Sequence, residues 1–257
     1  MLPRWVTLLP VLILLPPSET KSDGGDGSPL DLDGLSLPAL NPLRQKLAER
    51  LVELADDVPA SRIALGLGPT QDDEIERNTA LFTSPTAPAL SRYTGVLYDA
   101  LDARSFTKAG RARAAARLWI GSALFGAVRA YDCVPSYRLS GGSKIPGFGT
   151  LRSHWKPELT DALVAQADGI VVDLRSGTYQ QLGPVPGAIT ATVLTEKPDG
   201  SRSVVSHFNK HHKGLLARAL TLTTAEPKDV KGLARVAAKS GLRVEVASPT
   251  ELIVLTE

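Results

Sequence analysis

One stretch near the start of the chain reads Val11-Leu12-Ile13-Leu14-Leu15-Pro16-Pro17-Ser18-Glu19-Thr20-Lys21. Its first five residues form a short, continuous apolar run, which is typical of a strand that is buried on both faces of a sheet. The two prolines end this strand and begin a turn of polar residues. Because polar groups that follow a buried strand often lie at a binding site, we expect Ser18, Glu19 and Lys21 to line a cleft, or else to form an exposed, capped turn.

The remainder of the chain predicts an irregular alternation of helices and strands. Further strands are expected at residues 169–174, 188–194, 202–208, 242–247 and 251–255. Helices are expected at residues 41–56, 59–66, 72–81, 90–101, 108–120, 152–167, 210–222 and 227–239. No repeat or linker interrupts the pattern, so we predict a single α/β domain of the mixed (α+β) kind, with a mixed β-sheet covered by helices.

Residues 1–17 resemble a secretory signal, with Arg4 followed by an apolar run from Leu8 to Leu15. Prolines at positions 3, 10, 16 and 17 break a continuous helix, and the run from Leu8 to Leu15 is too short to span a bilayer. We therefore interpret residues 1–10 as an extension from an upstream start codon and residues 11–257 as the domain. We expect no membrane association.

The composition is that of an ordinary globular protein, with 43% hydrophobic and 22% charged residues in a chain of 257. The single cysteine, Cys133, excludes an internal disulfide and fits a cytoplasmic location. Aromatic residues make up only 5%, which argues against a sheet on which nucleic-acid bases stack.

Charge is unevenly distributed although the net charge is only +2. Residues 22–80 hold twelve acids and five bases, whereas residues 103–157 hold ten bases and one acid, Asp132. Residues 201–225 hold four Lys or Arg, three His and no acid. This bias predicts an electropositive face that attracts phosphate, the alternative being a solvated surface balanced by distant acids.

The segment Leu118–Gly126 outlines a helix-hairpin-helix element, in which backbone N–H groups at a helix start bind a DNA phosphate. The expected preceding helix supplies Arg111, Arg113 and Arg117, and Gly126 would let the backbone approach the phosphate. A packed turn between two helices has the same pattern. The similar run Lys144–Thr150 lacks a preceding helix, so we interpret it as a loop.

The segment Ser206–Gly214 contains the end of a strand and the start of a helix, with Lys210, Lys213 and, further on, Arg218 near the junction. A helix start flanked by lysines favours anion binding. The histidines at 207, 211 and 212 have no acid or cysteine beside them, so we predict no metal site. The sequence also lacks the common nucleotide, zinc and serine-hydrolase motifs, and no cofactor is expected.

Taken together, several segments resemble the YaaA family, a bacterial group linked to peroxide stress. They run in the family's order from residue 11 onwards, so residues 11–257 resemble one YaaA-like domain. The matching segments are Val11–Lys21, Tyr93–Tyr98, Gly121–Gly126, Pro135–Leu139, Val172–Ser176, and Ser206–Lys210 with Lys213-Gly214. The family's hairpin often begins with Gly, whereas Ala123 stands there in this chain.

The resemblance implies a cytosolic α/β protein with a positively charged cleft, a helix-hairpin-helix element and DNA binding. We therefore predict a DNA-binding protein of the oxidative-stress response that contacts duplex or branched DNA through phosphates and needs no obligate protein partner. The residues predicted to contact nucleic acid are Arg111, Arg113, Arg117, Gly126, Arg129, Arg138, Lys144, Lys210, Lys213 and Arg218.

An alternative is an enzyme that acts on a nucleotide or nucleobase in the same cleft. Ser18, Tyr137 and the candidate catalytic residues Glu19, Lys21, Arg138 and Lys210 would then converge. A buried carboxylate facing a lysine would favour this alternative, and an open basic groove would favour DNA binding. A redox sensor based on Cys133 is a weaker alternative, because no partner cysteine exists.

Overall fold

The computed structural model describes residues 11–204 and 209–256. The proposed extension at residues 1–10 and the end of the strand expected at 202–208 lie outside these ranges. Eight of the described strands form one mixed sheet in the order β4-β3-β1-β6-β7-β10-β9, with β8 paired to β7. The mixed α/β prediction is confirmed.

The sheet has a parallel centre and antiparallel edges. The parallel strands are β1 (Val11–Leu15), β3 (Leu118–Ser122), β6 (Ile170–Asp173), β7 (Ile189–Glu196) and β10 (Glu251–Thr256). The antiparallel strands are β4 (Gly126–Arg129), β8 (Arg202–Val204) and β9 (Arg243–Ser248), which pair with β3, β7 and β10. A separate small sheet joins β2 (Ala87–Pro88) to β5 (Cys133–Val134).

Strand β1 lies between β3 and β6, and all five of its residues are buried. This confirms the prediction from the apolar run. A central parallel strand has neighbours on both sides and helices on both faces, so every position along it favours an apolar side chain.

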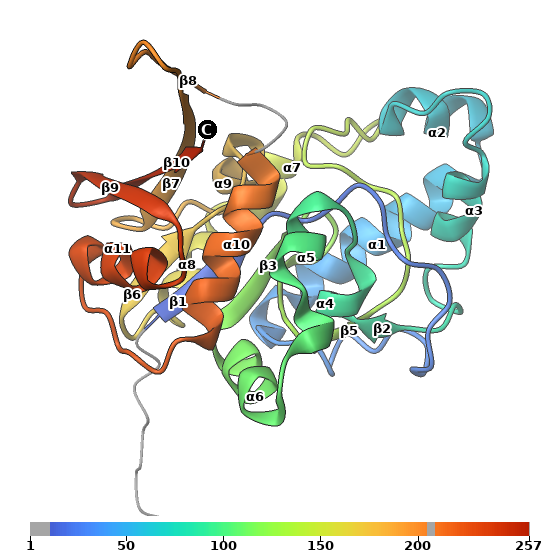
Figure 1. Ribbon diagram of the computed structural model, residues 1–257. Helices are drawn as coiled ribbons and strands as arrows, with labels where there is room; N and C mark the ends of the chain where they lie inside the picture. Colours follow the sequence, from blue (N-terminus) through green and yellow to red (C-terminus); the bar gives the residue numbers. More distant parts are fainter. Residues whose placement is uncertain (1–10, 205–208, 257) are drawn as a thin grey trace, which may run out of the picture.

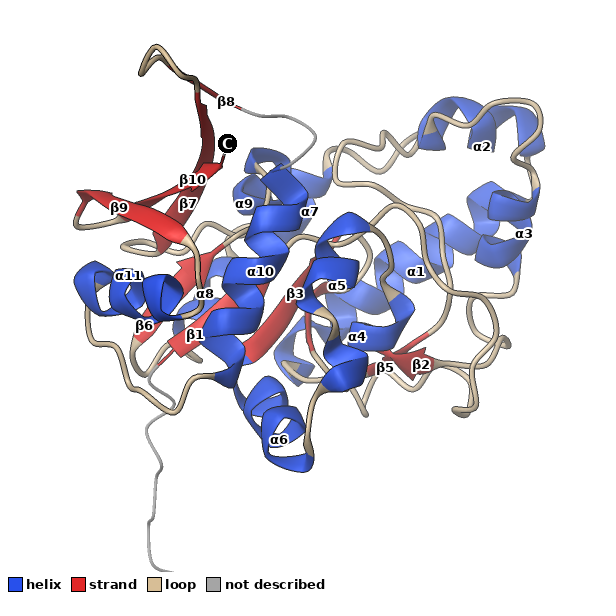
Figure 2. Cartoon of the chain, in the orientation of Figure 1, coloured by secondary structure: helices blue, strands red, loops and turns tan. Residues whose placement is uncertain are grey.

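Helices cover the two faces of the sheet. The helix α10 (Asn209–Leu222) crosses the front in Figure 1 with α5 (Val96–Leu101) beside it, and the more distant α1 (Asn41–Ala55) lies behind. Figure 2 shows the remaining helices around this centre. They are α2 (Val58–Leu65), α3 (Asp73–Thr79), α4 (Ala89–Arg92), α6 (Lys108–Arg117), α7 (Leu151–Trp155), α8 (Glu158–Val164), α9 (Gly177–Leu182) and α11 (Val230–Lys239), with short 3₁₀ turns at Pro38–Leu40 and Ala103–Ser105.

The predicted helix-hairpin-helix element at 118–126 is wrong. Helix α6 ends at Arg117, and the next residues form the β3–β4 hairpin, every residue of which up to Val128 is buried. The spacing of apolar and small residues in this segment fits both the period of a helix and the period of a strand. The segment forms a strand because it pairs with β1 in the sheet, where its apolar side chains are buried.

Two of the predicted helices are each divided into two shorter helices. The helix predicted at 90–101 divides into α4 and α5, because Gly95 adopts a φ of 97° between them. The helix predicted at 152–167 divides into α7 and α8 at Lys156-Pro157. A residue before proline disfavours the helical region, which explains the second break.

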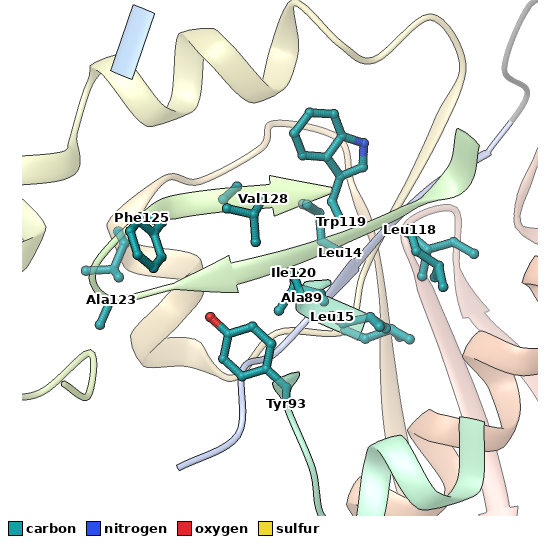
Figure 3. Packing of buried hydrophobic residues seen from close by; sticks show 14 of the residues in the cluster. Leu14, Leu15, Ala89, Tyr93, Leu118, Trp119, Ile120, Ala123, Phe125 and Val128 are labelled. Carbon is teal, nitrogen blue, oxygen red and sulfur yellow. The ribbon is translucent and has the colours of Figure 1, made fainter. Parts of the chain in front are cut away.

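Figure 3 shows the part of the core that packs around the β3–β4 hairpin. Trp119, Phe125 and Val128 are at most 2% exposed. Trp155 of α7 donates a hydrogen bond from its indole N–H to the carbonyl of Ala123 at 2.8 Å, which fastens the hairpin turn to the helix. The hairpin is therefore a core element and not a surface for DNA.

Candidate functional site

The carboxyl end of β1 is the centre of the candidate site. Leu14 pairs with Asp173 of β6, and Leu15 pairs with Ile120 of β3, so three parallel strands end together. The chain goes from β1 to β3 on one side and later returns to β6 on the other. The strand order therefore reverses at β1, and open α/β sheets bind ligands at such a position.

Lys21 returns over this edge and pairs with Tyr93 through an isolated antiparallel bridge. The backbone N–H of Ser22 donates to the carbonyl of Arg92 at 2.9 Å. The guanidinium of Arg92 is fully buried and donates to the carbonyls of Ser22, Gly24 and Val134. These contacts hold the loop after β1 in one position, so Lys21 is placed by the fold.

The amine of Lys21 lies among aromatic rings. The residue is 8% exposed, and its Nζ lies 4.2 Å from the ring centre of Tyr137 and 5.5 Å from that of Tyr93. Its hydrogen bonds are long, at 3.3 Å to the carbonyl of Ser18 and 3.4 Å to that of Glu19. Burial lowers the pKa of Lys21 to about 8, and the nearby charge of Glu19 opposes this shift only in part.

A chain of hydroxyl groups lies beside the amine. The hydroxyl groups of Tyr93 and Tyr137 form a hydrogen bond of 2.8 Å. The hydroxyl of Tyr137 forms a second one, also of 2.8 Å, with Oγ of Ser122. Figure 3 shows the Tyr93 hydroxyl directed towards the β3–β4 hairpin. Ser122 in turn accepts the backbone N–H groups of Leu124 and Phe125. Burial raises the pKa of both tyrosines, so both phenols keep their protons at neutral pH.

Glu19 and Arg138 form an ion pair at 3.3 Å on the exposed side of Lys21. Asn78 holds the backbone of Arg138 through two hydrogen bonds of 2.8 and 2.9 Å. Glu19 is about half exposed, so it is not the buried carboxylate expected for the enzyme alternative. No described carboxylate lies within 4.0 Å of the Lys21 amine.

A second polar group follows β6. Asp173 accepts two hydrogen bonds from the side chain of Arg175, at 2.9 and 2.8 Å, and both residues are buried. Lys213 of α10 donates to the carbonyl of Leu174 at 3.3 Å, and burial lowers its pKa. Gly121 makes room for this group, because a Cβ there would lie 2.9 Å from Cδ of Arg175.

The arginines predicted around the hairpin lie at the opposite edge, where the parallel strands begin. Arg117 is buried and donates to the carbonyls of Leu220, Thr221 and Thr223, so it caps the end of α10. Arg129 stacks its guanidinium 4.9 Å from the ring centre of Trp119. Arg113 is half-buried and Arg111 is exposed.

The other predicted cations lie on several elements of the fold. Lys144 and Lys210 are exposed, and Lys213 is half-buried. Arg218 lies further along α10 and donates to the carbonyls of Leu101 and Asp102, so it caps α5. Arginine side chains thus serve as caps for helix ends, a use that sequence periodicity does not reveal.

The predicted phosphate contact at Gly126 is also wrong. This glycine is buried at the start of β4 with a φ of 73°. A Cβ there would lie 3.0 Å from the ring of Trp155. The residue is glycine because the indole packs against it.

Sequence reasoning missed four polar residues. Tyr93 and Ser122 complete the hydroxyl chain, and their place in the segments Tyr93–Tyr98 and Gly121–Gly126 was the available signal. Arg104 and Lys108 are exposed next to Arg111 and were counted only in the overall charge. Cys133 is exposed on β5 and contacts none of these groups.

Neither metal-binding nor membrane-spanning features were found in residues 11–204 and 209–256. No three His, Cys, Asp or Glu side chains gather there in a way that could hold a metal ion. No helix in the described part of the chain combines the length and apolar character needed to cross a bilayer.

The protein is a mixed α/β domain with a buried amine and two buried phenols near the carboxyl end of its central strand β1. The sequence profile of the family described as peroxide stress protein YaaA matches residues 11–246. The chain therefore belongs to this family, and membership supports a role in the peroxide stress response.

Relatives match over nearly their whole length. UPF0246 protein CE1889 of Corynebacterium efficiens is 50% identical over 240 residues, which is 92% of this chain and 95% of the relative. A UPF0246 protein of Corynebacterium glutamicum is 48% identical, covering 91% and 95% of the two chains. UPF0246 protein SCO2297 of Streptomyces coelicolor is 42% identical, covering 94% of each.

Proposed function

We propose that this protein acts in the peroxide stress response by binding DNA through the phosphate backbone. The observation that supports the proposal is a group of exposed cations around α6, namely Arg104, Lys108 and Arg111. We call these three residues the α6 cations. Arg111 was already predicted from the sequence to contact nucleic acid. The α6 cations, in place of the predicted helix-hairpin-helix, are now the proposed DNA contact.

The α6 cations form no ion pair with a described residue, although Arg104 and Arg111 line a pocket with Asp99 and Asp102. The sequence holds no Asp or Glu between Ala103 and Tyr131. The nearest acid along the chain, Asp102, lies 3.4 Å from Arg218. Among the described residues, no carboxylate lies within 4.0 Å of the α6 cations.

The arrangement fits phosphate better than bases. Lys108 and Arg111 are three residues apart on one helix, so their side chains are neighbours on its surface. Long cationic side chains on an exposed helix contact the sugar-phosphate backbone, and such contacts carry no sequence information. We therefore expect binding without base specificity.

Fluorescence anisotropy with a labelled DNA duplex tests the proposal. If each α6 cation neutralises one phosphate, these contacts alone cost about 40-fold in affinity between 50 and 200 mM salt, since the slope of log K against log salt is about −0.9 per contact. Replacing all three with Glu should reduce the slope by about 3 and the affinity by more than tenfold at low salt.

A matched control is present in α11. Lys231, Arg235 and Lys239 are also exposed on a ten-residue helix, so their replacement with Glu makes the same change in net charge. The control should retain most of its affinity. An equal loss in both variants would show a general charge effect, and absence of binding by the wild type at 50 mM salt would refute the proposal.

A further inference from the structure

Lys21 is a buried cation without an anionic partner. An ammonium group has three N–H donors, and the two that find acceptors make only long hydrogen bonds to the carbonyls of Ser18 and Glu19. A buried lysine is normally paired, because desolvation of a charge is costly. Burial therefore favours the neutral amine, which is the nucleophilic form, and the Tyr137 ring at 4.2 Å, which attracts the ammonium, opposes this only in part.

The donor and the acceptor can be assigned for each hydrogen bond that Ser122 makes in the hydroxyl chain. Oγ of Ser122 accepts the N–H groups of Leu124 and Phe125 at 3.2 and 2.9 Å, which uses both of its lone pairs. The proton of Ser122 must then be donated to Oη of Tyr137, because that contact needs a donor. Ser122 thus sets the direction of the whole chain.

The tyrosine pair is left with one spare proton. The contact between Tyr93 and Tyr137 uses the proton of one phenol, whichever of the two donates. The other phenol makes no further hydrogen bond within 3.5 Å among the described residues, although Tyr93 also interacts with Ser122 and both tyrosines are 1% exposed. A phenol O–H that is not used within 3.5 Å therefore lies near the buried amine at the carboxyl end of β1.

We propose that Lys21 is a nucleophilic amine that forms an imine with a small aldehyde or ketone, whose carbonyl oxygen is bound by the Tyr93–Tyr137 phenol pair. Arg104 and Arg111 line a pocket that includes Tyr93, but Lys21 and Tyr137 are not part of its lining. The proposal goes beyond DNA binding and does not depend on it.

The reaction balances without any further reagent. The nitrogen lone pair of neutral Lys21 forms the C–N bond, and the carbonyl π electrons move to the oxygen, where the free phenol O–H stabilises the developing charge. A proton passes from nitrogen to this oxygen to give a carbinolamine. Loss of water then forms the C=N bond, so amine and carbonyl compound give imine and water.

Charged groups of both signs surround Lys21. Glu19 and Glu74 favour the ammonium form, whereas Arg138 and Arg77 oppose it. Burial among the tyrosine rings is the largest influence, and it lowers the pKa of Lys21 to about 8. At pH 7 about a tenth of the amine is then neutral, roughly 200-fold more than for an ordinary lysine with a pKa of about 10.4.

Reductive labelling of the full chain tests the proposal. The protein is incubated with propanal and sodium cyanoborohydride at pH 7 without DNA, and the propylated peptides are quantified by mass spectrometry over time. We expect Lys21 to be labelled about tenfold faster than the exposed Lys108 and Lys210, despite its burial. In urea-unfolded protein this preference should disappear.

A phenol variant tests the role of the tyrosines. Tyr137→Phe should slow labelling of Lys21 several-fold and leave labelling of Lys108 unchanged, whereas Lys21→Arg should yield no adduct at this position. Labelling of Lys21 no faster than that of Lys108 in the folded wild type would overturn the proposal. The variant with Glu at the α6 cations should label Lys21 as the wild type does, so failure of DNA binding and failure of this proposal are distinguishable.

Discussion

At the scale of single residues, Lys21 lowers the stability of the folded protein. Its pKa is about 8 in the folded protein and about 10.4 in an unfolded chain, so the unfolded chain binds more protons between these values. Stability from this group therefore rises as pH increases from 8 to 10 and is lowest below pH 8. A residue that costs stability at neutral pH is typical of a functional site.

Replacing Lys21 with Met should therefore stabilise the protein. We expect a gain of about 2 kcal/mol at pH 7, since a shift of about 2.5 pKa units corresponds to about 3 kcal/mol and the lost contact with the tyrosine rings offsets part of it. Urea unfolding at pH 7 and pH 9.5 measures this. The gain should shrink at the higher pH, and a variant less stable than the wild type at both would contradict the burial cost.

At the scale of elements, α10 connects the two edges of the sheet. Its start lies near the candidate site, where Lys213 contacts Leu174, and its end is capped by Arg117 of α6. It packs closely against α5 because Gly214 has no side chain. A Cβ at this position would lie 2.3 Å from the carbonyl oxygen of Leu97.

Gly214→Ala should separate α10 from α5. The clash is with backbone and so cannot be relieved by a rotamer change, and we expect a loss of about 2 kcal/mol even after the better helix propensity of alanine is counted. Thermal unfolding measures it. Gly177→Ala at the start of α9 is the control, because its Cβ would meet no atom within 4 Å, and its stability should change by less than about 0.5 kcal/mol.

At the scale of the whole molecule, the exposed cations belong to different edges of the sheet. The α6 cations lie next to the amino ends of the parallel strands, whereas Lys210 begins α10 near their carboxyl ends. A strand of five residues is about 16 Å long, which exceeds the Debye length of about 8–10 Å in physiological salt. The two groups therefore act independently on a bound polyanion.

Lys210→Glu should change the affinity for duplex DNA by less than about twofold, if DNA binds at the α6 cations. Substitution of Lys210 alone is preferable to substitution of Lys210 and Lys213 together. Lys213 is half-buried near Asp173, so a carboxylate there would disturb the fold. Anisotropy titrations at matched salt measure the change. A loss as large as that of the α6 variant would place the DNA at the carboxyl edge instead.

The sequence by itself determined the strand at 11–15, the mixed α/β class and the polar turn that carries Lys21, because a short apolar run ended by prolines has few alternatives. It also determined the family, through ordered segments. Only the tertiary structure decided that residues 118–126 form a buried hairpin, and that Arg117 and Arg218 cap helix ends. It likewise brought Tyr93, Ser122 and Tyr137 to Lys21. The physical reason is the distance along the chain. Burial and pairing between segments more than a hundred residues apart override local periodicity, and no local pattern shows which distant carbonyl or hydroxyl a side chain will meet.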